Sequence, residues 1–159
     1  MKKVFTVVIL LITLTVVKGQ VKENVKYQIV NKSGAVIDVH KASKDNNANV
    51  ALWDNKKAAN QQFYFIKFND FYYIKNVNSG KALDIKKGID KKKTNIHQYQ
   101  INLTDAQKFK IVDAKDGYYY LVSAKGNYLS SETVHGQRGS NIILWSKSNV
   151  AKWKFVEVK

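Results

Sequence analysis

Cysteine and proline are both absent from the 159 residues of this chain, and histidine is scarce. Without cysteine the chain cannot form a disulfide scaffold, a zinc ribbon or a thiol nucleophile, nor carry a lipid on an N-terminal cysteine. The three histidines, His40, His97 and His135, do not have the spacing of metal ligands, so we predict no metal site. No phosphate-binding loop and no nucleophile motif is present. The sequence therefore predicts neither a cofactor nor catalysis.

Acidic residues are also few, and they leave a strong positive charge. The chain has 27 Lys and Arg against 12 Asp and Glu, for a formal net charge of +15. Such a balance is typical of nucleic-acid-binding proteins. An apolar fraction of 45% with 12% aromatic residues is that of a globular domain, however, and excludes a disordered basic tail.

The first residues have the pattern of a secretory signal peptide. Two lysines precede an uncharged run, Val4–Val17, which is shorter than the about 20 apolar residues of a membrane span. Cleavage after Gly19 would leave a signal peptide over residues 1–19 and a mature domain over residues 20–159. The alternative is a buried N-terminal strand or an anchoring helix. We expect a secreted protein without a transmembrane anchor, and an exported protein has little opportunity to meet nucleic acid.

The chain repeats itself every 46 residues. Glycine begins three similar segments, GAVIDV, GKALDI and GNYLSS, and each unit ends in an aromatic-centred run, QQFYFI, QKFKIV or AKWKFV. The last of these runs comes two residues early. The repeat-equivalent positions are Gly34, Gly80 and Gly126; Tyr27, Tyr73 and Tyr119; Asn49, Asn95 and Asn141; and Trp53, Tyr99 and Trp145. We therefore predict three copies of one unit between about residues 26 and 158.

Short alternating apolar runs between polar turn residues predict strands, and no window shows helical periodicity. In the first unit these runs are Tyr27–Val30, Val36–Val39, Val50–Trp53 and Phe63–Ile66. Gly34 and its equivalents stand where a hairpin needs a positive φ. Twelve such strands can close around a shared core that one unit cannot form alone. The sequence thus predicts an all-β threefold barrel; a β-propeller is the weaker alternative because three blades are too few.

Threefold units of this length with a Gln-x-aromatic ending, as in QQF and QKF, resemble the ricin-B-type (QxW) lectin repeats. The resemblance covers essentially the whole mature chain and is strongest in the first unit, through VIDV, NVALW and NQQF. It implies a β-trefoil, with three repeats of four strands and a closed six-stranded barrel. It also implies binding of carbohydrate, often galactose or N-acetylgalactosamine, with up to one shallow site per unit.

The first unit has the residue types that a sugar site requires. A sugar presents hydroxyls and a face of C–H groups, so its site needs a carboxylate, an amide and an aromatic ring. By the resemblance, Asp38 is the carboxylate, Trp53 the stacking ring and Asn60 the amide. We expect Gln61 to hydrogen-bond Asp38 and hold its orientation. Ala51 cannot add the hydrogen bond that family members often make from its position.

The second unit keeps part of this set, and the third loses nearly all of it. We expect a weaker site in the second unit, formed by Asp84, Tyr99 and Gln107. Ala106 there replaces the amide, and the nearby side chains that can substitute for it are His97, Asn102 and Asp105. In the third unit only the aromatic ring survives, so we expect no binding; the corresponding residues are Ser130, Trp145, Val150 and Ala151.

These residues also have purely structural interpretations. Asp38 and Asp84 can end strands through hydrogen bonds to the backbone. The aromatic residues of the expected sites can belong to the core. Against this second interpretation, Phe63, Phe109 and Trp153 already supply one core aromatic residue per unit, which leaves the other set free to lie at the surface.

Five lysines lie close together in the second unit, in the segment KKGIDKKK, which we call the lysine loop: Lys86, Lys87, Lys91, Lys92 and Lys93. The lysine loop is either a solvated loop or a patch that attracts anions such as sulfated glycans. The first interpretation needs no ligand at all.

The sequence favours a secreted, non-catalytic lectin whose partners are glycans or glycoconjugates. A single shallow site binds weakly, so a homo-oligomer would gain avidity. Two alternatives remain open. One is a protein-binding trefoil module, such as a toxin-delivery subunit or an inhibitor, and the other is a polyanion binder that uses the lysine loop.

Overall fold

A computed structural model describes residues 21–133 and 136–159 of the chain, so the expected signal peptide lies outside the described residues. The described residues form twelve strands and four short 3-10 helices. The strands are β1 (Tyr27–Val30), β2 (Val36–Val39), β3 (Val50–Trp53), β4 (Phe63–Phe68), β5 (Phe71–Asn76), β6 (Ala82–Ile85), β7 (Ile96–Tyr99), β8 (Phe109–Asp113), β9 (Tyr119–Ser123), β10 (Tyr128–Ser131), β11 (Ile142–Trp145) and β12 (Lys154–Glu157). The 3-10 helices are η1 (His40–Ala42), η2 (Ala59–Gln61), η3 (Lys86–Gly88) and η4 (Asp105–Gln107).

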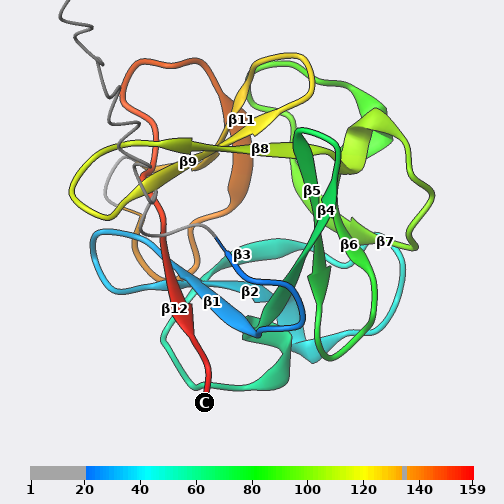
Figure 1. Ribbon diagram of the computed structural model, residues 1–159, viewed down its shortest axis with the longest axis vertical. Coiled ribbons are helices and arrows are strands. Elements are labelled where there is room, and N and C mark those ends of the chain that lie inside the picture. The colour runs from blue at the N-terminus through cyan, green and yellow to red at the C-terminus, as the bar shows by residue number, and fades with distance from the viewer. Residues whose placement is uncertain (1–20, 134–135) are drawn as a thin grey trace, which may run out of the picture.

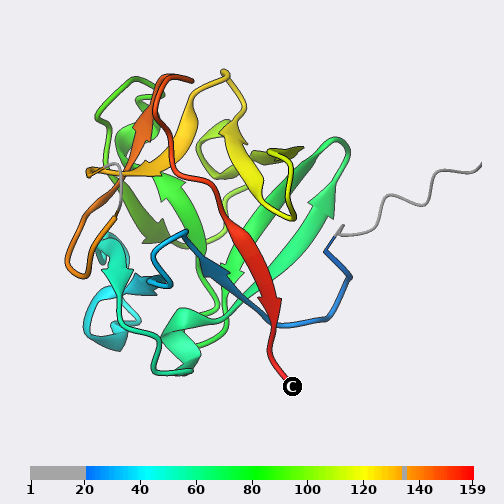
Figure 2. The same ribbon diagram turned by 90° about the vertical axis from the view of Figure 1, so that its left-hand side faces the viewer.

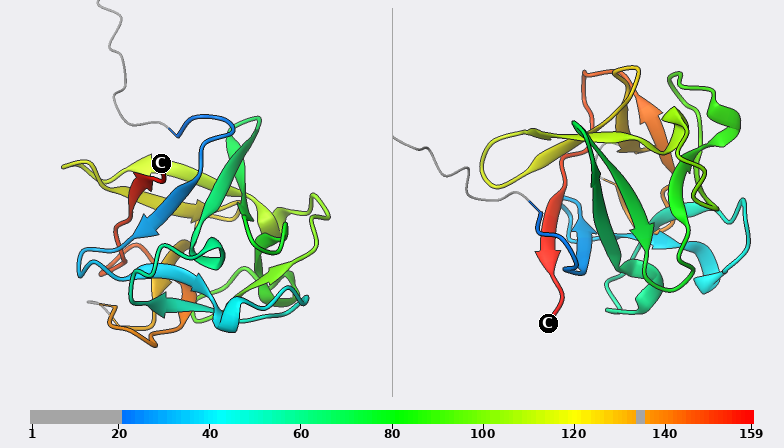
Figure 3. Two further views of the ribbon diagram at one scale, coloured as in Figure 1. Left: turned by 90° about the horizontal axis from the view of Figure 1, so that it is seen from below. Right: turned by 45° about the vertical axis from the view of Figure 1, so that its right-hand side comes forward.

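The strands confirm the all-β prediction and, in the first repeat, most of the predicted bounds. β1, β2 and β3 begin and end where the sequence pattern places them. The prediction for the fourth strand was wrong at its end, because β4 continues past Ile66 to Phe68. It continues because its last residues still pair with β5, where Phe68 lies opposite Phe71. The two strands form a long green hairpin in Figure 3.

Six strands close into the predicted barrel. Ladders join β12 to β1, β1 to β4, β4 to β5, β5 to β8 and β8 to β9. The ring is completed by a bridge between Tyr119, at the start of β9, and Trp153, just before β12; its two backbone hydrogen bonds are both 2.8 Å long. Figure 1 shows these strands in one view, and Figure 2 shows β12 (red) running beside β1 (blue). The last repeat therefore closes directly onto the first.

The other six strands form three hairpins, β2–β3, β6–β7 and β10–β11, one from each repeat. In each case a loop of one repeat donates a backbone hydrogen bond to the second hairpin strand of the next repeat. These bonds are Asn47 N–H to Gln98 O, Lys93 N–H to Leu144 O and Gly139 N–H to Leu52 O, all 2.8–2.9 Å. They recur with the 46-residue period of the sequence. Each hairpin is thus held by its neighbouring repeat as well as by its own.

Three repeat-equivalent asparagines form a hydrogen-bonded ring between the hairpins. Asn49 Nδ2 donates to Asn141 Oδ1, Asn141 Nδ2 to Asn95 Oδ1, and Asn95 Nδ2 to Asn49 Oδ1, at 2.5–2.9 Å. Every amide in the ring donates once and accepts once. The ring therefore links all three repeats through side chains of identical chemistry.

The barrel interior is filled by one large aromatic residue from the end of each repeat. Phe63, Phe109 and Trp153 are fully buried, as predicted. The indole N–H of Trp153 donates to Leu129 O at 3.0 Å, which satisfies the one polar atom that this ring brings into the core. Because the chain has no cysteine, noncovalent contacts hold the barrel closed.

The hairpin glycines adopt the backbone conformation that their positions predict. Gly34, Gly80 and Gly126 have φ values of +88°, +71° and +92° in the turns before β2, β6 and β10. A residue with a side chain is strained at such φ values, whereas glycine is not. The turn geometry thus explains why glycine occurs at this position in all three repeats.

We predict that Asn95→Ala lowers the free energy of unfolding by about 1–2 kcal/mol, because it removes two hydrogen bonds and leaves Asn49 and Asn141 each short of one partner. Urea denaturation followed by tryptophan fluorescence measures the change. Gln137→Ala removes an exposed amide for which the described residues provide no side-chain hydrogen bond, and it should change the stability by less than about 0.5 kcal/mol. Equal losses in the two variants would show that the ring contributes nothing.

Candidate functional site

The first-repeat residues lie together on the outer face of the β2–β3 hairpin. Asp38 pairs with Ala51 across the hairpin, and Val36 pairs with Trp53. Because side chains alternate along a strand, Asp38, Ala51 and Trp53 share one face, while Leu52 points into the core. The short helix η2 places Asn60 and Gln61 against the same carboxylate. The structure thus brings together all four residues proposed for the first repeat.

Gln61 holds Asp38 in place, as the sequence analysis expected. Its Nε2 donates to Asp38 Oδ2 at 2.8 Å and to Asp54 O at 2.9 Å. Its Oε1 accepts from the backbone N–H of Lys56 at 2.8 Å. The Gln61 side chain is therefore fully used by the protein, and at 1% exposure it is a structural support beneath the site rather than a ligand contact.

Asn60 completes the support of the carboxylate. Its Nδ2 donates to Asp38 Oδ2 at 3.0 Å and to Val39 O at 2.9 Å. Both amides thus converge on one carboxylate oxygen. The described residues provide no donor to the other oxygen, Asp38 Oδ1, or to Asn60 Oδ1. Two acceptors on one surface patch therefore remain for a ligand that carries hydroxyl groups.

Burial raises the pKa of Asp38, because desolvation penalises the charged carboxylate. The hydrogen bonds from Gln61 and Asn60 act in the opposite direction, as do the nearby His40 and Lys56, but they do not cancel the effect of burial. A carboxylate whose pKa rises on folding stabilises the native state only below its ordinary pKa, and this contribution is lost as the pH rises through the raised value. At neutral pH Asp38 therefore adds no stability through its charge.

A cation that the sequence analysis did not predict lies over the ring of Trp53. The Arg138 guanidinium carbon lies 4.3 Å from the ring centroid, and Arg138 Nη1 lies 3.0 Å from Asp54 Oδ2. Arg138 belongs to the third repeat, so Trp53 is oriented by a residue from a neighbouring unit. A cation over an aromatic face is worth about 0.5–2 kcal/mol. The sequence gives one indication of this contact, because Arg138 lies one repeat period, 46 residues, after Lys92.

The second repeat reproduces the support of the carboxylate. Gln107 Nε2 donates to Asp84 Oδ2 at 2.8 Å and to Gln100 O at 2.9 Å, and its Oε1 accepts from Asn102 N–H at 3.0 Å. These are the repeat equivalents of the bonds that Gln61 makes. Tyr99 ends β7 as Trp53 ends β3, and it is partly exposed. Asp84, Tyr99 and Gln107 therefore occupy the predicted arrangement.

His97 replaces the missing amide of the second repeat as a partner of the carboxylate. Its Nε2 lies 3.0 Å from Asp84 Oδ1, and its ring stacks on Tyr99 with centroids 6.0 Å apart. The other ring nitrogen, Nδ1, is buried, and none of the described residues hydrogen-bonds to it. Both oxygens of Asp84 thus have a protein partner, whereas only one oxygen of Asp38 does.

The second-repeat residues line a pocket of about 540 Å³. Asn102 and Asp105, the other two candidates for the missing amide, line it as well, but neither contacts the carboxylate of Asp84. Asn102 Oδ1 accepts from Thr104, and Asp105 pairs with Lys108 at 2.8 Å. They border the pocket as exposed side chains with their own partners.

In the third repeat the residues at the position of the sugar site have a structural role. Ser130 and Ala151 stand at the positions of Asp38 and Gln61, and Ser130 Oγ accepts a hydrogen bond from the backbone N–H of Ala151 at 3.0 Å. A side-chain-to-backbone bond thus replaces the carboxylate–glutamine bond of the other two repeats. Trp145 is partly exposed, and Lys92 Nζ lies 4.1 Å from its ring centroid. The carboxylate and both amides are missing from this position.

The lysine loop does not present its charges as one patch. Lys86 and Lys87 line the second-repeat pocket, whereas Lys92 covers Trp145. Asp90 ties the loop to the turn before β10, because its carboxylate accepts from Ser123 Oγ at 3.0 Å and Asn127 Nδ2 at 2.8 Å. Lys91 and Lys93 are exposed.

Two further searches covered residues 21–133 and 136–159. In this part of the chain no three His, Asp or Glu side chains come together as ligands for a metal ion. None of its helices combines the length and hydropathy needed to span a membrane.

The family model of the ricin-type β-trefoil lectin domain-like proteins matches the chain twice, over residues 13–99 and 59–145. The chain belongs to this family. The two matches are displaced by 46 residues, which is the repeat period of the sequence. A comparison with curated protein sequences gives no match.

Solved structures agree with this trefoil assignment. The designed threefold-symmetric protein ThreeFoil has a TM-score of 0.80 and 31% identity, over 84% of this chain and 99% of its own. An exo-β-1,3-galactanase from Clostridium thermocellum has a TM-score of 0.81 and 32% identity, over 87% of this chain, which spans only 31% of the galactanase. A ricin B-like lectin from Macrolepiota procera, solved with lactose, has a TM-score of 0.70 over 86% of this chain and 97% of its own; at 19% identity it supports the fold alone.

We predict that Gln61→Ala lowers the free energy of unfolding of this trefoil by about 2–4 kcal/mol, because it removes three hydrogen bonds: one of the two to the buried Asp38 carboxylate, and those to Asp54 O and the Lys56 N–H. Thermal denaturation in a calorimeter measures the loss. Gln62→Ala, which removes one exposed bond to Lys57 O, is the neighbouring control and should cost less than about 1 kcal/mol. If both variants melt alike, Gln61 is not the support of the site.

Proposed function

We propose that the chain is a secreted, non-catalytic lectin that binds galactose-type glycans chiefly through the first-repeat site. One observation carries the proposal. Gln61 and Asn60 both donate to the same oxygen of the buried Asp38 carboxylate, so that the other oxygen is left to accept hydroxyl protons beside Trp53. The ligand would be a terminal galactose or N-acetylgalactosamine.

The chemistry of the site fits a sugar ring. A carboxylate oxygen accepts the protons of one or two hydroxyls, and the free Asn60 Oδ1 offers a further acceptor. The partly exposed Trp53 ring supplies a flat apolar surface for the C–H face of the sugar. Arg138 and Asp54 hold this ring in one orientation before the ligand arrives, which reduces the entropy lost on binding.

Similarity to known proteins supports the same function. The matching family model is that of ricin-type β-trefoil lectin domain-like proteins, and the Clostridium thermocellum protein, which is 32% identical over 87% of this chain, is an exo-β-1,3-galactanase. Secretion is proposed from the N-terminal sequence pattern alone. The absence of catalysis is proposed because the site offers acceptors and an apolar face but no activated nucleophile.

The second repeat is proposed as a weaker site for the same ligand class. Asp84 keeps its glutamine support and Tyr99 its position, but His97 already occupies the oxygen that is free in the first repeat. A hydroxyl ligand there would have to share Asp84 Oδ1 with the imidazole. Two such sites on one chain, or assembly of several chains, would raise the apparent affinity for a multivalent surface by about 10²–10⁴-fold.

We predict that Asp38→Ala and Trp53→Ala each weaken lactose binding by about tenfold or more, because each removes a direct contact to the sugar. Isothermal titration calorimetry of the mature chain measures the dissociation constants. The matched controls are Asp70→Ala, an exposed carboxylate in the β4–β5 turn, and Trp145→Ala, the equivalent ring of the third repeat. Both should bind within about twofold of the wild type. Unchanged binding by Asp38→Ala would overturn the site assignment.

On acidification, lactose binding should begin to weaken at a higher pH than it would if Asp38 had the pKa of an ordinary aspartate. The pKa of Asp38 is raised by burial, and only the ionised carboxylate accepts hydroxyl protons on both lone pairs of its free oxygen. Affinity is therefore retained above the raised pKa and lost as the pH falls through it. Titrations at a series of pH values test this, with Asp38→Asn as the control whose weaker binding should not change with pH in that range. An acid limb that persists in Asp38→Asn would assign the titration to another group.

A further inference from the structure

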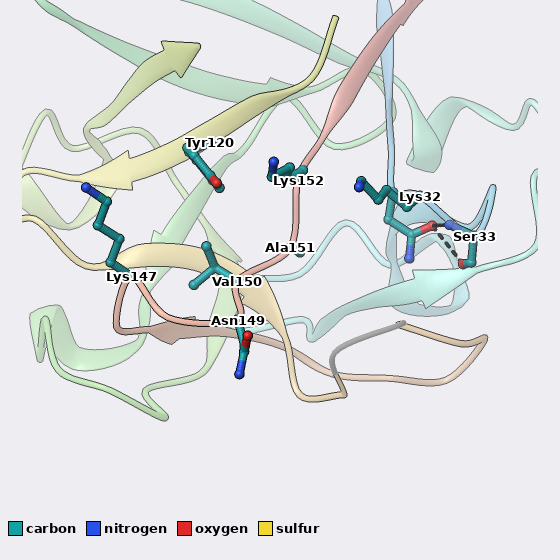
Figure 4. Close-up of a pocket in the computed structure, with 9 residues that line it drawn as sticks. Lys32, Ser33, Tyr120, Lys147, Asn149, Val150, Ala151 and Lys152 are labelled. Carbon is teal, nitrogen blue, oxygen red and sulfur yellow. Dashed lines mark hydrogen bonds between the residues drawn. The ribbon is translucent and has the colours of Figure 1, made fainter. Parts of the chain in front are cut away.

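A second pocket lies between the two ends of the repeat array. It has a volume of about 460 Å³ and is lined by the β1–β2 turn of the first repeat, the β11–β12 connection of the third repeat and one residue of β9. Figure 4 shows Lys32 and Ser33 on one side, Tyr120 and Lys152 above, and Lys147, Asn149 and Val150 on the other side.

Three lysines from two separate segments, the β1–β2 turn and the β11–β12 connection, converge on this pocket. Lys32 comes from the β1–β2 turn, Lys147 follows β11, and Lys152 precedes β12. None of the nine lining residues is acidic. Within the described ranges no carboxylate forms an ion pair with any of the three lysines, whereas Lys22, Lys108 and Lys115 do have such partners. The pocket therefore concentrates positive charge that the protein itself does not neutralise.

Lys152 and Lys32 make contacts that position them, whereas Lys147 is exposed. Lys152 Nζ donates to Ala114 O at 3.1 Å and lies 5.7 Å from the Tyr120 ring centroid. Lys32 Nζ lies 5.7 Å from the centroid of Tyr118. The turn that carries Lys32 is built on Asn31, which is 6% exposed and accepts hydrogen bonds from Ser33 and Ala35. The rim thus has a fixed shape before any ligand binds.

The pocket shares Val150 and Ala151, the third-repeat equivalents of Asn60 and Gln61, with the unused sugar position of that repeat, but it does not include the ring of Trp145. Trp145 lines a separate hollow of about 250 Å³ with Ser131 and Glu132. Asn149 borders both, so the β11–β12 connection separates the two. We call it the lysine pocket from here on; its three lysines have no equivalents among the residues of the proposed galactose sites.

We propose that the lysine pocket binds an acidic saccharide through its sulfate or carboxylate groups. The volume is many times the about 30 Å³ that one water molecule occupies, so a lone inorganic anion would leave most of it unfilled. The Tyr120 ring and Val150 offer apolar surface for a sugar ring, and Asn149 and Ser33 offer hydrogen bonds to its hydroxyls. A concave site of this kind suits an oligosaccharide better than a flat lipid surface. The inference stands independently of the galactose site.

The test is calorimetric titration of the mature chain with a chondroitin sulfate tetrasaccharide at physiological ionic strength, with a hyaluronan tetrasaccharide as the arm that carries carboxylates without sulfate. The double variant Lys32→Gln/Lys147→Gln should bind about tenfold more weakly or worse. The matched control, Lys91→Gln/Lys93→Gln, removes the same charge from the lysine loop and should stay within about twofold. Val150→Glu, which adds a negative charge without removing a lysine, should also lose binding.

Titration with lactose distinguishes a failure of this inference from a failure of the proposed function. The double variant Lys32→Gln/Lys147→Gln should bind lactose like the wild type, and Asp38→Ala should bind the acidic tetrasaccharide like the wild type. Equal weakening by the pocket pair and the lysine-loop pair would overturn the inference, because it would show attraction to net charge alone. So would failure of the wild type to bind either tetrasaccharide, or binding only to vesicles of anionic phospholipid.

Discussion

No repeat of this protein can bury its own apolar face, and everything else in the structure depends on how the three repeats complete one another. The barrel closes where the third repeat meets the first, through β12 on β1 and the bridge between Tyr119 and Trp153. The hairpins are joined by equivalent backbone bonds and by the ring of Asn49, Asn95 and Asn141. Because the chain has no cysteine, noncovalent contacts such as these join the two ends of the repeat array.

The same dependence shapes the candidate sites. Trp53 in the first repeat is oriented by Arg138 from the third, and Trp145 in the third is covered by Lys92 from the second. The lysine pocket likewise exists only because the first and third repeats meet. Binding surfaces on this fold therefore belong to the junctions between repeats, and a substitution in one repeat can alter the site of another.

Symmetry also explains what the sequence could and could not predict. Local geometry repeats with the chain, so the turn glycines, the strands and the bond from Gln61 to Asp38 followed from periodicity and residue type. The cation over Trp53 depends on packing between repeats that no short segment contains. His97 was one of three candidates to replace the amide of the second repeat, and the pairing of β6 with β7, which places it opposite Asp84, selects it. The extension of β4 to Phe68 was missed for a similar reason, because it is set by the partner strand β5.

The central claim is that the first repeat is the principal sugar site, and the three tryptophans allow a direct test. Each indole N–H gives one signal in a ¹H–¹⁵N NMR spectrum, and the three rings lie in the first-repeat site (Trp53), in the unused third-repeat position (Trp145) and in the core (Trp153). Titration with lactose is predicted to shift the signal of Trp53 and to leave the other two in place. A titration in which Trp53 does not move, or in which Trp145 moves instead, would contradict the account.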